Sequence, residues 1–201
     1  MDNFNKIQAL AKEYCDGHYD PDVPTQFWKP VFEYIVDNHK LLDIDKSEVH
    51  GAWFSNAEHI RRKVNDDNLL AKVLKVTLPV YNESGLTVYR GTSLALYNEG
   101  KLGFCWSKCK DCATRFSIQN ADEHGGVLLE AYAPKEAIFT APNAISIKKK
   151  EFEYTCDPRL LKNVKIIGDS PKTDGRVYQA GPVELIWPRP TRKIRPSYYD
   201  V

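Results

Sequence analysis

Apolar residues recur every three to four positions through much of the first 80 residues, a spacing that predicts amphipathic helices. Ser55 followed by Glu58 has the pattern of a capping box. In a capping box a serine begins the helix, and the side chain of a glutamate three residues later accepts a hydrogen bond from the serine's backbone N–H. Pro79 stops the last of these patterns. We expect helices over Asn5–Tyr14, Phe27–Ile35, Ser55–Val64 and Leu69–Val76.

The pattern changes near Leu86 to short runs rich in branched and aromatic residues, most of them bounded by Gly, Pro, Asn or Asp. We expect strands at Leu86–Arg90, Leu102–Ser107, Val127–Ala133, Ala137–Thr140, Glu151–Cys156, Val164–Ile167 and Val183–Trp187. Only Lys108–Ile118 interrupts these runs with a convincing helical pattern. Strands joined mainly by loops favour an α+β fold over a doubly wound parallel sheet.

The expected organisation is one domain over residues 1–201, with a helical part packed on a mixed or antiparallel β core. Residues 1–80 form the helical subregion, residues 81–187 the β-rich core, and residues 188–201 a basic, Pro-rich tail. A hydrophobic content of 42% is enough to bury one core.

Charge and the N-terminus restrict the partners and the compartment. Twenty-eight basic and 27 acidic residues give a formal charge of +1, so no general attraction to nucleic acid or to an anionic membrane is expected. For the basic tail, Arg189–Arg195, we expect an extended surface segment or disorder, and the alternative is that an acidic partner or nucleic acid binds there. The first residues lack the features of a signal peptide, and no run of 18 apolar residues occurs that could span a membrane. We therefore expect a cytoplasmic protein, and action in the cytoplasm of a host cell is compatible with this expectation.

The cysteines allow two interpretations. Cys105-x3-Cys109-x2-Cys112 has the spacing of the iron–sulfur loop in radical SAM enzymes. However, Cys109, Cys112, Ala113 and Phe116 also fall at i, i+3, i+4 and i+7, which is one apolar face of a helix. The histidines form no metal-spaced pair. We therefore predict that these thiols face the core and that the protein binds no metal.

Three segments carry candidate chemistry, and the first is Tyr89-Arg90-Gly91 at the end of a predicted strand. The planar donor fork of an arginine suits a pyrophosphate, and a following glycine leaves room for a ligand to approach the backbone. An arginine at a strand end is also compatible with simple solvation.

The second segment is Trp106-Ser107, where a strand ends just before a helix. The serine could serve as no more than a helix N-cap. The third is Glu151-Phe-Glu153, in which period-two alternation places both carboxylates and Thr155 on one face of a strand. An ordinary surface strand remains an equally good interpretation of that third segment alone.

Taken in this order, the three segments resemble the R-S-E mono-ADP-ribosyltransferases, whose pattern is an Arg, a Ser and then E-x-E on successive strands. The second segment is also similar to a form common among bacterial and phage members, W-[ST] followed after five residues by A-x-x-F; here it is Trp106-Ser107, then KCKDC, then Ala113-Thr-Arg-Phe116. The similarity spans about residues 86 to 168.

The resemblance implies a β core of the ADP-ribosyltransferase type, a split β-sandwich, and NAD⁺ as co-substrate with no metal. It assigns the pyrophosphate to Arg90 and the stabilisation of the ribosyl cation to Glu153. Ser107 would steady Glu153, and Glu151 would orient the incoming nucleophile. The residues expected around the cofactor are Tyr89, Arg90, Gly91, Trp106, Ser107 and Phe116.

The expected partner besides NAD⁺ is a protein acceptor, with an arginine side chain as the first choice, because E-x-E is associated with arginine acceptors in the family. Two alternatives use the same segments. Water as acceptor would give an NAD⁺ glycohydrolase, and a silent member would bind a partner without catalysis.

Overall fold

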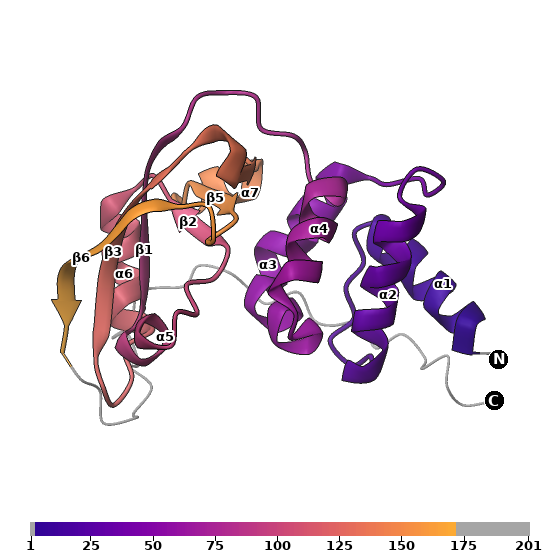
Figure 1. The fold of residues 1–201 in the computed structure, drawn as a ribbon, viewed down its shortest axis with the longest axis horizontal. Coiled ribbons are helices and arrows are strands. Elements are labelled where there is room, and N and C mark those ends of the chain that lie inside the picture. Colours follow the sequence, from indigo (N-terminus) through magenta and orange to yellow (C-terminus); the bar gives the residue numbers. More distant parts are fainter. Residues whose placement is uncertain (1–2, 172–201) are drawn as a thin grey trace.

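The computed structural model of the chain describes residues 3–171, which form a group of helices followed by a strand-rich region (Figure 1). The first four helices are α1 (Asn3–Cys15), α2 (Thr25–Asn38), α3 (Lys46–Val64) and α4 (Asp67–Thr77). Their apolar faces enclose a core whose largest fully buried members include Tyr14, Trp28, Phe32, Ile35 and Trp53. The four helices predicted from the periodicity are confirmed.

Helix α3 begins nine residues earlier than the capping-box pattern predicted. Its N-cap is Asp45, whose carboxylate accepts hydrogen bonds from the backbone N–H groups of Ser47 and Glu48 at 3.1 and 3.0 Å. The start predicted at Ser55 is therefore wrong, and Ser55 and Glu58 lie one turn apart in the middle of a long helix.

Within residues 3–171, six strands form one sheet in the order β4-β5-β2-β1-β3-β6, and every neighbouring pair is antiparallel. Their bounds are β1 Leu86–Ser93, β2 Cys105–Ser107, β3 Gly126–Ala133, β4 Ile138–Thr140, β5 Glu153–Cys156 and β6 Lys162–Ser170. The fold class is therefore α+β with an antiparallel sheet. The strand predicted at Val183–Trp187 and the basic tail Arg189–Arg195 lie outside the described residues.

Several strand boundaries differ from the prediction, and two of the differences fall at candidate site residues. β1 does not end at Arg90, because the backbone from Gly91 to Ser93 continues to pair with β3. β5 begins at Glu153 rather than at Glu151. Three short elements were not predicted: the helices α5 (Leu94–Asn98) and α7 (Ala144–Lys148), and the 3₁₀ turn η1 (Lys135–Ala137).

The sheet has its own apolar cluster, which includes Val88, Trp106, Leu129 and Tyr154. Helix α6 (Lys110–Gln119) packs on β1 beside it. No helix within residues 3–171 is both long and apolar enough to cross a membrane.

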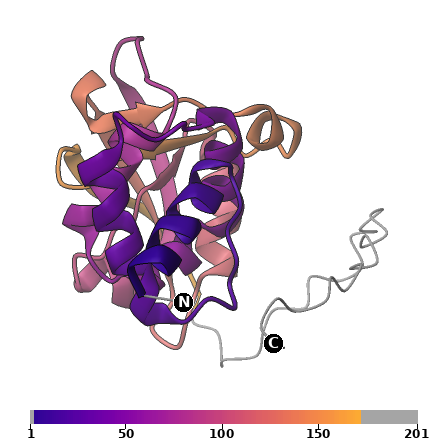
Figure 2. The same ribbon diagram turned by 90° about the vertical axis from the view of Figure 1, so that its right-hand side faces the viewer.

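Buried contacts join the helices to the sheet. The indole Nε1 of Trp53 on α3 donates a hydrogen bond to the Thr155 hydroxyl on β5 at 3.1 Å, and Phe104 packs edge-on against the same indole. These contacts hold α3 beside the sheet, as two perpendicular views show (Figures 1 and 2). Helix α3 therefore faces the strands that carry the candidate residues.

Candidate active site

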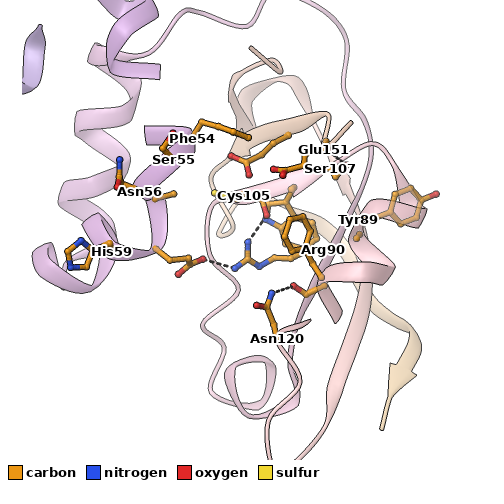
Figure 3. A pocket seen from close by; sticks show the side chains of 17 residues that line it. Phe54, Ser55, Asn56, His59, Tyr89, Arg90, Cys105, Ser107, Asn120 and Glu151 are labelled. Atoms are coloured by element: carbon orange, nitrogen blue, oxygen red, sulfur yellow. Dashed lines mark hydrogen bonds and ion pairs between the residues drawn. The ribbon is translucent and has the colours of Figure 1, made fainter. Parts of the chain in front are cut away.

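A cleft of about 380 Å³ lies between α3 and the sheet (Figure 3). Residues of α3 from Phe54 to His59 form one side of it. The other sides come from β1, β2, α6 and the segment around β5. The predicted residues that line it are Tyr89, Arg90, Gly91, Trp106, Ser107, Phe116, Glu151 and Glu153.

The order of the strands explains how residues far apart in sequence meet in this cleft. β2 lies between β1 and β5, so Ser107 pairs with Tyr89 on one side and with Glu153 on the other. Arg90 is the next residue along β1. The three elements of the R-S-E pattern therefore lie on three adjacent strands.

The guanidinium of Arg90 is held on two sides. Its Nη1 donates to the backbone carbonyl of Cys105 at 2.6 Å, and its Nη2 pairs with the Glu58 carboxylate on α3 at 2.8 Å. Gly103 leaves the space that the guanidinium fills, because a Cβ there would lie 2.6 Å from Nη2. The buried Nε has no hydrogen-bond partner among the described residues.

Glu58 differs from Arg90 in its exposure. The Arg90 side chain is only 11% exposed, whereas that of Glu58 is 56% exposed. The carboxylate of Glu58 can therefore leave the pair without breaking the packing, and another anion can take its place on the guanidinium.

Ser107 has its hydroxyl fully engaged with backbone groups. The Oγ donates to the carbonyl oxygen of Glu151 at 2.5 Å and accepts from the backbone N–H of Cys109 at 2.9 Å. The N-cap of α6 is Cys109, so Ser107 is not the helix cap that the sequence also allowed. Its hydroxyl fixes the backbone of Glu151 against the end of β2.

The two glutamates do not share a strand face as predicted. Phe152 between them has a φ of +46° and Lys150 has a φ of +58°, so the chain kinks before β5 starts. Ser146 on α7 stabilises the kink, since its Oγ accepts from the Glu153 backbone N–H at 2.7 Å and its carbonyl accepts from the Glu151 N–H at 2.9 Å. Both carboxylates still line the cleft.

The Glu153 carboxyl is set apart by its surroundings. Burial raises its pKa to about 8, while a hydrogen bond with the Cys105 thiol and the charge of Arg90 act in the opposite direction. A carboxyl poised near neutral pH in a cleft is a common feature of functional sites.

Two of the predicted cofactor residues, Gly91 and Trp106, have structural tasks as well, and a third, Tyr89, points away from the centre of the cleft (Figure 3). Gly91 is covered by α6, and a Cβ there would lie 2.1 Å from the Ala113 carbonyl oxygen, so the room expected for a ligand is filled by helix backbone. The Trp106 indole is 1% exposed in the sheet core and donates to the Gly103 carbonyl at 3.1 Å.

The cysteine prediction is confirmed for part of the cluster. Cys112 and Ala113 on α6 are buried at 1% exposure each, whereas Cys109 is partly exposed. Cys105 lies on β2 and faces the cleft instead of joining them. Among residues 3–171 no group of three or more His, Cys, Asp or Glu side chains is arranged to hold a metal ion.

Several residues of the cleft were missed by the sequence reasoning. They are Cys105 and the α3 residues Phe54, Asn56, Glu58 and His59, together with Asn120 at the end of α6. Asn120 donates through Nδ2 to the Gly91 carbonyl at 3.1 Å. The signal available for α3 was the polar face of its helix, but nothing in that pattern indicated which strands it would meet.

Comparisons of the chain with protein-family models, with curated proteins and with solved structures gave no match.

Proposed function

We propose that the cleft binds NAD⁺ and that the protein is a mono-ADP-ribosyltransferase, which releases nicotinamide and transfers ADP-ribose to a protein side chain. The observation that carries the proposal is the convergence of Arg90, Ser107, Glu151 and Glu153 on one cleft. These residues lie on three segments that are far apart in the sequence, and the strand order brings the segments together.

The chemistry required is modest and suits these side chains. The bond to be broken joins the anomeric carbon of a ribose to a positively charged nicotinamide, which leaves as a neutral molecule. Positive charge then develops on the ribose, and an ionised Glu153 would stabilise it electrostatically. Arg90 would bind the pyrophosphate through the guanidinium edge that Glu58 now occupies.

Glu151 would orient the incoming acceptor. Its backbone is fixed by the Ser107 hydroxyl, while its side chain lines the mouth of the same cleft. An arginine acceptor fits two neighbouring carboxylates, because a guanidinium is a planar cation with several donors.

The test measures nicotinamide release and the transfer of labelled ADP-ribose by the purified protein, with and without a mixed protein extract. Labelled protein bands that depend on the enzyme support the transferase. Release that is independent of the extract, with no labelled protein, would identify an NAD⁺ glycohydrolase instead. Absence of both activities under conditions in which the protein is folded would refute the proposal.

A further inference from the structure

The residue that the sequence pattern assigned to steady Glu153 donates its hydrogen bond elsewhere. Ser107 donates its hydroxyl proton to the Glu151 carbonyl, so it has no proton left to donate to Glu153. We propose that Cys105 is the positioning residue for Glu153, its thiol donating a hydrogen bond that holds the carboxylate toward the cleft. The assignment to catalysis rests on the proposed function; the contact itself does not.

The register of the sheet places the two side chains on one face. Cys105 pairs with Thr155 and Ser107 pairs with Glu153, so these four side chains point to the same side of strands β2 and β5. Cys105 and Glu153 are therefore diagonal neighbours, within reach of a long side chain such as Glu. Both residues line the cleft, and the interaction of the thiol with the carboxyl shifts the pKa of each group.

Cys105 also connects the two charged groups of the site. Its backbone carbonyl accepts the hydrogen bond from Arg90 Nη1 at 2.6 Å, while its side chain lies diagonally across from Glu153 on the same face of the sheet. The position of this one residue therefore fixes the guanidinium relative to the carboxylate. A shift of β2 would move both.

The surroundings keep the thiol in the form that donates. Burial, followed by the charge of Glu153, raises the pKa of Cys105 well above its ordinary value, so the thiol stays protonated across the working pH range. A hydrogen bond to the ionised form of Glu153 favours that form, which opposes the effect of burial on the carboxyl. Other ionisable groups near Glu153 are Arg90 on β1, Glu58 and His59 on α3, Glu151 before β5, and Cys156 on β5.

The experiment compares Cys105→Ala, which removes the donor, with Cys105→Ser, which restores a hydroxyl donor. Two quantities are measured in each: the pH profile of nicotinamide release, and the pKa of Glu153 from NMR titration of ¹³C-labelled glutamate. The Glu153→Gln variant assigns the resonance. Cys15→Ala is the matched control, because it removes a buried thiol from the helical core, away from the cleft.

We expect Cys105→Ala to raise the pKa of Glu153 by about half a unit, which lowers activity at pH 7 about threefold through the smaller ionised fraction. Cys105→Ser should return both quantities toward wild type, and Cys15→Ala should move neither. If Cys105→Ala does not fold, Cys105→Val keeps the volume without the donor and replaces it.

An unchanged pKa of Glu153 in the folded Ala or Val variant would overturn the proposal, as would a Ser variant that behaves like Ala. If wild type releases no nicotinamide, the proposed function fails. The NMR titration still decides in that case whether Cys105 holds Glu153.

Discussion

Replacing Gly91 by Ala tests why a glycine follows the arginine of the first segment. A Cβ at this position would lie 2.1 Å from the Ala113 carbonyl oxygen and 2.1 Å from the Ser117 backbone nitrogen. Both obstacles are backbone atoms of α6, so a side-chain rotation cannot relieve the clash. Overpacking of a well-filled site costs about 1–3 kcal/mol, and we expect Gly91→Ala to lie at the upper end of that range.

The measurement is thermal unfolding followed by circular dichroism. A loss of about 3 kcal/mol should lower the Tm by about 6–12 °C in a protein of this size. Gly168→Ala on β6 is the matched control, because its Cβ would meet only the Leu128 side chain, at 3.6 and 3.8 Å. Its Tm should stay close to that of wild type. A Gly91→Ala protein that melts with wild type but binds ADP-ribose poorly would refute this reasoning and restore the interpretation of Gly91 as a ligand contact.

Three further substitutions test the proposed chemistry. Glu153→Gln should reduce nicotinamide release by about a hundredfold or more. Near-normal turnover would remove Glu153 from the mechanism. The same variant should also raise the Tm at pH 9, because the pKa of the Glu153 carboxyl rises from 4.5 to about 8 on folding. A carboxyl with such a shift makes the folded state less stable as pH increases between those two values. Glu151→Gln should sharply reduce transfer to protein while sparing NAD⁺ hydrolysis, and an equal fall in both would show that Glu151 supports the cation site or the local fold. Glu58→Gln should tighten ADP-ribose binding about two- to fivefold in calorimetry, because it removes an anion that competes for Arg90. Glu99→Gln, which alters another exposed ion pair, should leave the binding unchanged. Weaker binding by Glu58→Gln would show that Glu58 does not compete with the ligand.

The periodic parts of the sequence predicted most of the secondary structure. Because each helix and strand of this chain buries one face, the spacing of its apolar residues predicts whether it is a helix or a strand. The resemblance to the R-S-E pattern, and not the periodicity, selected Arg90, Ser107 and Glu153, which the strand order brings to one cleft. Their proposed roles remain predictions.

The details that fix the site could not be predicted from local patterns. Alternation predicted that Glu151 and Glu153 share a face, but the left-handed backbone of Phe152 breaks that alternation. A non-glycine residue in this conformation depends on its tertiary surroundings, here the hydrogen bonds that Ser146 on α7 accepts from the backbone N–H groups of Glu151 and Glu153. The helix α7 itself has only five residues, too few to show a period.

The pattern at Ser55 and Glu58 failed for a different reason. Residues spaced i and i+3 satisfy a capping box, but they also lie on one face of any continuous helix. Because the helix is capped at Asp45, Ser55 and Glu58 lie inside a continuous helix and do not form a capping box. The helix face that carries Glu58 lines one side of the cleft. Ser55 and Glu58 line the cleft because α3 packs beside the sheet, and the spacing of residues within a helix cannot predict such a long-range contact.

The charges of the cleft explain why the helical part belongs to the site. Arg90 lies among three carboxyl groups, those of Glu58, Glu151 and Glu153, and Glu153 is the one whose pKa burial raises to about 8. An excess of negative groups favours a developing ribosyl cation or an incoming guanidinium, but it opposes a pyrophosphate. An anionic ligand that took the Nη2 edge of Arg90 would displace Glu58, which is the exposed member of the pair and the one carried by α3. In the proposed function, α3 would therefore help to set the affinity of the cleft for phosphate, while the strands hold the groups that would act on the ribose.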